Sequence, residues 1–304
     1  MHLTVVIPYY KRRFLRATLE SLVSQSDQRF RVFVGDDASP EDPAELIRTY
    51  QSKLDLTYHR FADNQGGRSV VAQWNRCVRT TQSDWVWLFS DDDTASADCV
   101  AGFYDMLAHP APFSDVYRFQ SSVIDEKGLL LRESPENPPL ESAAELALCR
   151  MLAYREFFVQ NHIFSRASFN RCGGMVDLPC GFFSEDASYA AMGKATGIVS
   201  LPRGRVYWRQ SDGNLNAPRP ELVDQKLAAF TQYVTWASQT FHDQGPAYQR
   251  GLRIGASSWI RRAVGLLGGV PSWLNQIKFY WFFLRFSPLR LPRVMSATHA
   301  VWSR

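Results

Sequence analysis

The feature that most constrains the fold of this 304-residue chain is an alternation of short apolar runs with segments of helical spacing. The apolar runs, bounded by Pro, Gly or Asp, predict strands at residues 3–8, 31–35, 54–61 and 84–90. After each run, apolar residues recur every three or four positions, which predicts helices at residues 14–25, 43–50, 69–79 and 97–107. Such alternation predicts an α/β protein with a mostly parallel sheet and helices on both of its faces.

The pattern changes after residue 110. Residues 116–124 and 129–132 flank the turn sequence 125–128 and predict a hairpin, and Ser142 with Glu145 forms a capping box that opens a helix to about residue 153. Further strands are predicted at residues 156–164, 198–201 and 205–208, and further helices at residues 185–192, 221–241, 250–266 and 272–286. We therefore expect an α/β domain over residues 1–220 and a helical extension over residues 221–304.

The extension carries an unusual charge pattern. Residues 251–304 contain eight Lys and Arg, no Asp or Glu, and many aromatic residues. A cationic and aromatic segment favours an anionic membrane surface or a nucleic acid. No nucleic-acid-binding motif is found and the remaining chain is acidic, so no nucleic acid partner is expected. The alternative is a helical pair that packs its aromatic side chains on the body and exposes its arginines.

Composition also bears on location. The five Cys are odd in number and lack metal-ligand spacing, which favours a reducing compartment. The N-terminal residues do not resemble a signal peptide, and the apolar run at 272–286 is too short to span a bilayer but suits an interfacial helix. We expect a cytoplasmic protein that is peripheral at the inner face of the membrane.

Acidic and Gly-rich segments follow the predicted strands. Asp36 and Asp37 end the second strand, the turn 64–68 follows the third, and Asp91–Asp93 end the fourth. Ligands of open α/β sheets bind at the carboxyl ends of the strands, where these segments would meet. Three adjacent carboxylates repel one another, and Mg²⁺ or Mn²⁺ would relieve that repulsion. The alternative is a solvated helix N-terminus. The sequence has no GxxxxGK[ST], GxGxxG or HExxH motif.

Four segments together resemble the successive motifs of the family 2 glycosyltransferases, which have the GT-A fold. They are VVIPYYKR at 5–12, VGDDAS at 34–39, DNQGGRSVVAQWNRCV at 63–78 and WLFSDDDTAS at 87–96. The resemblance implies a Rossmann-like, mostly parallel sheet flanked by helices, with a nucleotide-binding half at 1–110 and an acceptor half at 111–220. It also implies transfer of a sugar from a nucleotide diphosphate to an acceptor, usually with inversion.

The resemblance assigns a nucleotide site. Pro8, Tyr9 and Arg12 would line the base and ribose pocket, and Asp37 or Asp36 would accept a hydrogen bond from the base. The turn at 64–68, with Asn64, Gly67 and Arg68, would lie near the nucleotide.

It assigns a metal site to the acidic triplet. Asp91 and Asp93 would match the acids of the family's metal motif, with Asp93 preferred as the ligand of Mn²⁺ or Mg²⁺ and Asp92 near the ribose or the metal. The family commonly has an acid where this sequence has Ser90, so the register of the ligands stays open.

The resemblance also implies catalytic groups. An inverting transfer needs a base opposite the diphosphate, and Asp186 is chosen, with Glu185 as the alternative. The pair could instead be an ordinary acidic first turn of a helix capped by Ser184. Arg209, in a segment that resembles a flexible loop over the diphosphate, would offset charge on the leaving group; it could instead be a surface ion-pair residue.

We expect a glycosyltransferase that uses a nucleotide-diphospho-sugar, with a UDP-sugar favoured, and a glycan or lipid-linked saccharide acceptor. One alternative is an inactive, glycosyltransferase-like scaffold or membrane-binding protein. Another is a nucleotidyltransferase, although that class normally has a Gly-rich loop where this chain has PYYKRR.

Overall fold

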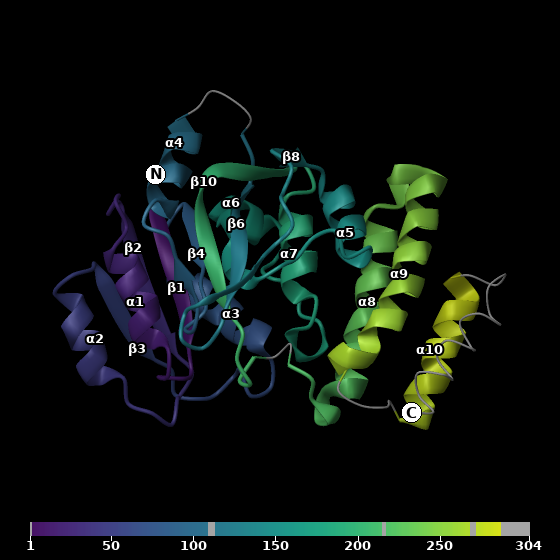
Figure 1. Cartoon of the computed structure of the whole chain (residues 1–304), viewed down its shortest axis with the longest axis horizontal. Helices are drawn as coiled ribbons and strands as arrows, with labels where there is room; N and C mark the ends of the chain where they lie inside the picture. Colours follow the sequence, from purple (N-terminus) through teal and green to yellow (C-terminus); the bar gives the residue numbers. More distant parts are fainter. Residues whose placement is uncertain (1, 109–112, 215–216, 268–271, 287–304) are drawn as a thin grey trace.

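A computed structural model describes residues 2–108, 113–214, 217–267 and 272–286. The described strands form one mixed sheet in the order β3-β2-β1-β4-β9-β6-β10-β5, with β7 paired to β6 and β8 paired to β10 (Figure 1). The strands are β1 (Leu3–Tyr9), β2 (Phe30–Asp36), β3 (Leu56–Arg60), β4 (Trp85–Leu88), β5 (Thr94–Ala95), β6 (Val116–Ile124), β7 (Leu130–Glu133), β8 (Leu140–Glu141), β9 (His162–Ser165) and β10 (Ile198–Arg209). The helices are α1 (Leu15–Val23), α2 (Ala44–Gln51), α3 (Val70–Thr80), α4 (Cys99–Ala108), α5 (Ala143–Met151), α6 (Arg166–Arg171), α7 (Ser184–Met192), α8 (Val223–Thr240), α9 (Gly245–Leu267) and α10 (Trp273–Phe286).

Helices cover both faces of the sheet, as the alternation predicts. In β1, Leu3, Val5 and Ile7 pack in a core with α1, α2 and α4. Val6, which points to the opposite face, packs in a second core that includes α3, α5 and α7. This division follows from the period of two in a strand, which sends successive side chains to opposite faces.

The first half of the sheet is parallel and the second is mixed. β1 pairs in parallel with β2 and β4, and β2 pairs in parallel with β3, as predicted. β9 runs antiparallel to both of its neighbours, β4 and β6. The strand predicted at 156–164 is thus largely wrong, because a 3₁₀ turn, η1 (Val159–Asn161), precedes the short β9.

Two other predictions concern the strands near β6. The hairpin of β6 and β7 is confirmed. The two strands predicted at 198–201 and 205–208 are one strand, β10, whose pairing with β6 shifts register between Ser200 and Arg205. The capping box is also confirmed, because Ser142 Oγ accepts from the Glu145 amide while the Glu145 carboxylate accepts from the Ser142 amide.

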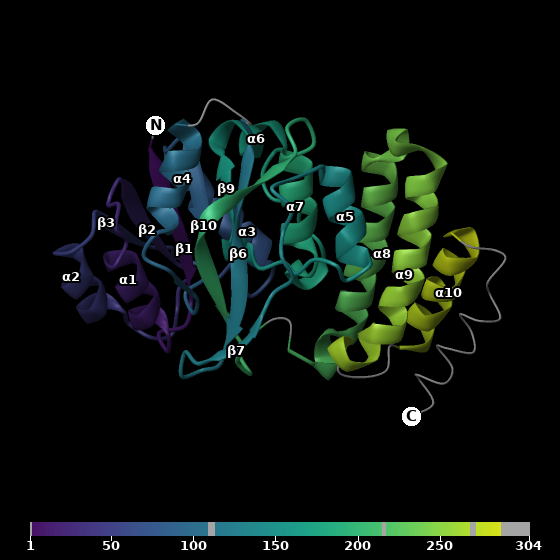
Figure 2. The ribbon, with the colours of Figure 1, turned by 45° about the horizontal axis from the view of Figure 1, so that its top comes forward.

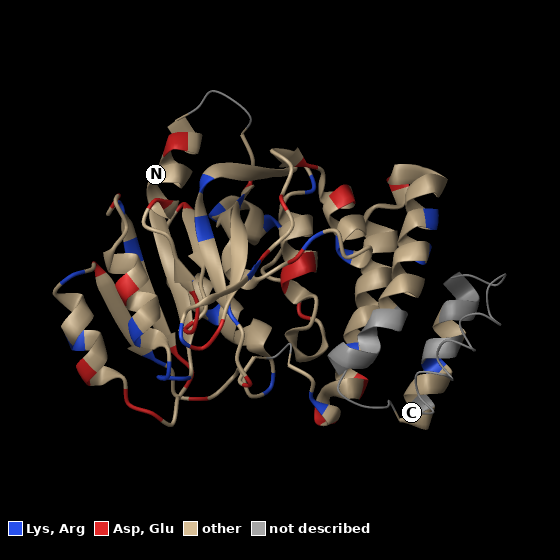
Figure 3. Ribbon diagram, in the orientation of Figure 1, with Lys and Arg blue, Asp and Glu red and all other residues tan. Residues whose placement is uncertain are grey.

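The C-terminal helices α8, α9 and α10 lie side by side at the end of the molecule away from α2 (Figures 1 and 2). The described parts of α8 and α9 carry few charges (Figure 3). The Trp259 ring stacks on Phe230 with centroids 4.0 Å apart, and one continuous core joins both residues to α7 and the sheet. The boundary that we predicted between residues 220 and 221 therefore crosses a shared core.

The two predictions for the cationic segment at residues 251–304 each fit a different part of it. Leu252, Ala256 and Trp259 are buried, so this part packs on the body, as the alternative proposed. In α10, by contrast, Trp273 and Trp281 are 72% and 69% exposed. Of the eight cations of the segment, only Arg253 and Lys278 have described side chains, and both are exposed. Residues 287–304 lie outside the described residues.

Candidate active site

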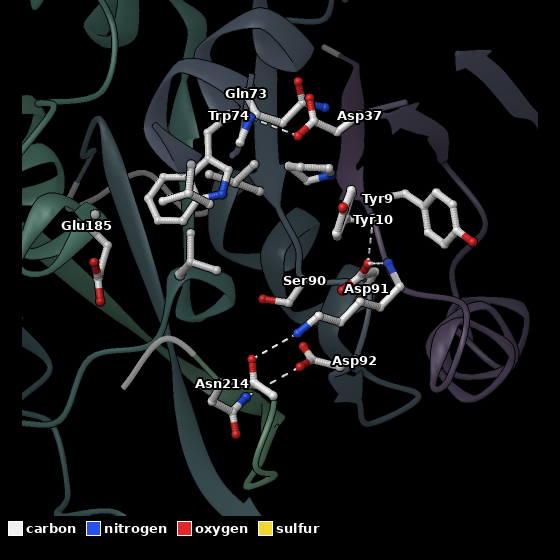
Figure 4. A pocket seen from close by; sticks show the side chains of 18 of the residues that line it. Tyr9, Tyr10, Asp37, Gln73, Trp74, Ser90, Asp91, Asp92, Glu185 and Asn214 are labelled. Atoms are coloured by element: carbon white, nitrogen blue, oxygen red, sulfur yellow. Dashed lines mark hydrogen bonds between the residues drawn. The ribbon is translucent and has the colours of Figure 1, made fainter. Parts of the chain in front are cut away.

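A cavity of about 370 Å³ opens at the carboxyl ends of β1, β2 and β4 (Figure 4). One wall comes from residues 8–11, Asp37, the turn after β3 and the segment 88–92. The opposite wall comes from η1, from residues 180–185 and from the segment after β10. Figure 4 shows Glu185 across the cavity from Tyr9 and Asp91. The segments that the sequence singled out therefore meet at one site.

Asp37, which directly follows β2, is the acid at the end of this strand that lines the cavity. Its carboxylate accepts from the amides of Gln65 at 2.9 Å and Gly66 at 2.7 Å, and from the Arg76 guanidinium at 2.6 Å. A Cβ on Gly66 would lie 2.5 Å from Asp37 Oδ2, so this close approach requires glycine. Burial nevertheless raises the pKa of Asp37. The turn is thus folded around a buried carboxylate.

Asp36 points to the other side of the strand. It is fully buried, and it accepts from the Ser39 amide at 2.7 Å and from Arg60 at 2.8 Å. It does not line the cavity, so our assignment of Asp36 to the nucleotide site is not supported by the geometry. Consecutive residues of a strand face opposite ways, which explains why only one of the two acids can do so.

Some of the other predicted nucleotide-site residues line the cavity and some do not. Pro8, Tyr9, Asn64 and Gly67 line the cavity. Arg12 and Arg68 do not line it, and both are exposed. The geometry therefore gives no support to these two arginines as pocket residues.

Asp91 and Asp92 line the cavity, whereas Asp93 does not. Asp91 Oδ2 accepts from the amides of Tyr10 and Lys11, each at 2.9 Å, which fixes the end of β1 against the end of β4. Burial raises the pKa of Asp91, and burial together with the charge of Asp91 raises that of Asp92 to about 7. Asp93 is 1% exposed and accepts from the Arg209 amide at 2.7 Å.

These acids fit one mode of metal binding. Within the described residues, no group of three or more His, Cys, Asp and Glu could hold an ion with protein ligands alone. Mg²⁺ is commonly bound by one or two carboxylates together with substrate phosphates. Asp91 and Asp92 supply such a pair. Burial raises the pKa of both carboxyls, and the charge of Asp91 raises that of Asp92 further, so a bound cation would stabilise their ionised forms. Asp93, our preferred ligand, is displaced from the cavity wall because it holds the Arg209 backbone.

Arg209 is not placed to act on a leaving group. It is 4% exposed, and its guanidinium donates to the backbone carbonyls of Asp92, Asp125 and Glu126 at 2.8–3.1 Å. The residue does not line the cavity. We therefore correct its assignment from a catalytic group to one that ties the acidic loop to the β6–β7 turn.

Of the two acids at the start of α7, Glu185 lines the cavity and Asp186 does not. Asp186 is 1% exposed, and its Oδ1 accepts from Arg150 Nε at 2.7 Å. Burial and the charge of Asp186 raise the pKa of Glu185 to about 8. Adjacent residues of a helix point about 100° apart, so only one of the two can face the cavity.

Sequence reasoning missed several lining residues. Lys11 and Arg219 both donate to the Gly213 carbonyl, at 3.0 and 3.3 Å, and place two cations at the cavity. Phe158 and Trp208 stack with ring centroids 4.8 Å apart and an interplanar angle of 14°. Lys11 lies next to the first predicted strand end and could have been found there. The aromatic pair is separated by 50 positions in the sequence and carries no local signal.

The sequence is similar to those of known glycosyltransferases. The family model described as glycosyl transferase family 2 matches residues 4–169, more than half of the chain. Among curated proteins, a chondroitin synthase of Pasteurella multocida is 24% identical over 245 residues, covering 70% of this chain and 25% of that protein. The poly(ribitol-phosphate) β-N-acetylglucosaminyltransferase TarS of Staphylococcus aureus is 25% identical over 151 residues, covering 49% of this chain and 25% of that protein.

A crystal structure of S. aureus TarS 1–349 in complex with UDP-GlcNAc superposes with a TM-score of 0.66 at 15% identity, covering 97% of this chain and 84% of that one. A Pyrobaculum calidifontis mannosyltransferase in complex with GDP-Man and Mn²⁺ gives a TM-score of 0.54 at 15% identity, covering 99% of this chain and 87% of that one. At these identities the likeness shows the fold alone, which is that of the GT-A glycosyltransferases. The chain spans about a quarter of the length of the two curated relatives. In the described ranges, no helix is both long and apolar enough to cross a membrane.

Proposed function

The chain belongs to glycosyl transferase family 2, and we propose that it transfers a sugar from a UDP-sugar to a glycan or lipid-linked saccharide with inversion. The observation that carries the proposal is the two-sided cavity. Asp37, Asp91 and Asp92 line one wall, and Glu185 lines the other. Crystal structures of TarS with UDP and with UDP-GlcNAc support UDP as the nucleotide. The family match disfavours the nucleotidyltransferase alternative.

In this proposal the nucleotide lies at the end of β1 and β2. Asp37 accepts a hydrogen bond from the base, while Tyr9 and Pro8 bound the base and ribose. Asn64 and Gly67 contribute from the turn after β3. The support is that all five residues line the same cavity and that the Asp37 carboxylate accepts from two backbone amides, which fix its position.

The diphosphate lies at the end of β4. Asp91 and Asp92 would hold Mn²⁺ or Mg²⁺, which supplies positive charge to the phosphate oxygens. Lys11 and Arg219 add positive charge from the protein, since both side chains already converge on the Gly213 carbonyl. Charge that develops on the departing UDP is thereby offset without Arg209.

The base is Glu185 in this proposal. The acceptor hydroxyl oxygen attacks the anomeric carbon from the side opposite the diphosphate, and the bond from that carbon to the phosphate oxygen breaks. The hydroxyl proton passes to the Glu185 carboxylate. Its pKa of about 8 makes the ionised carboxylate a stronger base than an ordinary glutamate, and the ionised fraction grows as the pH rises toward 8. Asp186, our choice from the sequence, is ion-paired with Arg150 and positions the start of α7.

The test compares Glu185→Gln with Asp186→Asn. Both keep the side-chain size, and circular dichroism and thermal melting check the fold. We expect Glu185→Gln to lower the rate of UDP release in the presence of acceptor by about 10²–10⁴-fold, while UDP affinity stays unchanged. Loss of transfer in Asp186→Asn alone, with a native melting curve, would return the base to Asp186.

The proposal includes a second partner besides the acceptor, which is an anionic membrane surface. The enzyme would be cytoplasmic and would bind this surface as a peripheral protein. Trp273, Ile277 and Trp281 are exposed and spaced four residues apart, so they form one apolar stripe on α10. The nearby Lys278 is exposed as well. An amphipathic helix with these features lies in a bilayer interface.

A truncation at residue 251 cannot test the membrane, because Leu252, Ala256 and Trp259 belong to the core. We would instead measure sedimentation with vesicles of phosphatidylglycerol and phosphatidylcholine for a Trp273→Ser/Trp281→Ser variant. The matched control is Tyr154→Ser, another exposed aromatic. Equal binding of all three proteins to the vesicles would contradict the membrane role.

A further inference from the structure

Gln160 is a buried amide with no hydrogen-bond partner for its side chain. It lies in η1, is 0% exposed and lines the cavity. Neither Nε2 nor Oε1 has a partner among the described residues. Buried polar groups in folded proteins are nearly always paired, so an amide that is unpaired at both ends and borders a cavity points to a ligand.

The position of Gln160 is set by its backbone. Its carbonyl accepts from Trp87 Nε1 at 2.7 Å, and Trp87 lies in β4, three residues before Ser90. The residue therefore contacts β4, the strand after which the acidic pair Asp91 and Asp92 follows. Its backbone is fixed independently of its side chain, so the amide group has no role in holding this turn.

An aromatic pair lines the same cavity as Gln160. Phe158, two residues earlier, stacks with Trp208, and both rings line the cavity. Faces of aromatic rings suit the apolar face of a sugar ring, while an amide suits its hydroxyl and acetamido substituents. The lining of the cavity thus includes a stacked aromatic pair and a glutamine amide in addition to Asp91, Asp92 and Glu185.

We infer that Gln160 recognises a polar substituent of the transferred sugar and decides which sugar the enzyme accepts. The sugar lies against the Phe158–Trp208 pair, and one hydroxyl or acetamido group donates to Gln160 Oε1 and accepts from Nε2. This inference rests on the proposed function, because it assumes a donor whose diphosphate lies at Asp91 and Asp92. A site that leaves a buried amide unpaired rejects an analogue that lacks the matching group.

Gln160 differs from Gln25, a buried glutamine whose side-chain hydrogen bonds stabilise the fold. Gln25 is 4% exposed, its Nε2 donates to the carbonyls of Ser21 and Ser96, and its Oε1 accepts from the Val100 amide. Replacing Gln25 with Leu removes three hydrogen bonds and should lower the melting temperature. Replacing Gln160 with Leu removes none that the structure shows, and should leave the melting temperature equal or higher.

The experiment is isothermal titration calorimetry of UDP, UDP-glucose, UDP-galactose, UDP-GlcNAc and UDP-GalNAc with Mn²⁺. We compare the wild type with Gln160→Leu, and with Gln160→Asn as a second variant that keeps the amide but withdraws it by one methylene. We expect both variants to bind UDP within twofold of the wild type. For the UDP-sugar that the wild type prefers, Kd should rise at least tenfold, and the preference among the four sugars should shrink.

The outcomes are distinct. Unchanged sugar preference in both variants, with wild-type UDP affinity, would overturn the role of Gln160 and leave the proposed function standing. A drop in melting temperature for Gln160→Leu as large as that for Gln25→Leu would also overturn it, because the amide would then serve the fold. If the wild type bound UDP and all four UDP-sugars no better than buffer, the proposed function would fail together with the inference.

Discussion

Glu185 gives the sharpest link between the geometry of the cavity and a measurable quantity. Burial and the charge of Asp186 raise its pKa from 4.5 to about 8. Between these values the folded protein holds a proton that the unfolded chain has lost. The free energy of unfolding should therefore fall as pH rises through this window, since the folded state binds more protons there.

The magnitude follows from the shift. One pKa unit corresponds to about 1.4 kcal/mol, so the full shift would amount to roughly 5 kcal/mol. Because the carboxyl borders an open cavity, solvent screening reduces this, and we expect about 2 kcal/mol. Glu185→Gln mimics the protonated side chain and should lack this component of the pH dependence.

The assay is urea unfolding of the wild type and Glu185→Gln at half-unit steps from pH 5 to 9, without ligand. The two free energies of unfolding should agree near pH 5, and the variant should be more stable by about 2 kcal/mol above pH 8. Glu136→Gln, which changes an exposed glutamate, serves as the control and should follow the wild type. Parallel curves for the wild type and Glu185→Gln would refute the placement of this carboxyl in a buried, acid-crowded site.

Four further predictions test the surroundings of the cavity. Lys11→Met should raise the Kd for UDP about tenfold at low ionic strength and leave uridine binding unchanged by calorimetry, since only the diphosphate is charged. Asp92→Asn should abolish the difference that Mn²⁺ and EDTA make to the UDP-induced rise in melting temperature; a metal effect that persists would contradict the ligand assignment. Arg209→Met should lower the free energy of unfolding in urea by roughly 2–4 kcal/mol, because the buried guanidinium's three hydrogen bonds to part-buried backbone carbonyls are lost. Ser142→Ala should lower it by about 1 kcal/mol, because the capping box of α5 loses its N-cap hydroxyl.

Much of the fold was accessible from local patterns. The parallel pairing of β1, β2, β3 and β4 follows from apolar runs and helical spacing that each lie within about a dozen residues. The antiparallel insertion of β9 was not accessible, because its four buried residues show no alternation that would reveal a direction. The register shift in β10 was missed for a similar reason, since it arises where β10 meets β6.

By itself, the sequence determined that acids and a Gly-rich turn lie at the ends of neighbouring strands, because parallel strands bring their carboxyl ends to one edge. Only the tertiary structure decided which acid of each pair faces the cavity: Asp37 and not Asp36, Asp92 and not Asp93, Glu185 and not Asp186. Adjacent side chains point about 180° apart in extended chain and about 100° apart on a helix, and in the loop after β4 the contact of Asp93 with the Arg209 amide draws that acid away from the cavity. A sequence motif therefore locates a cavity-lining carboxylate to within one residue. Which of the two adjacent side chains faces the cavity depends on the face of the element that the rest of the chain buries.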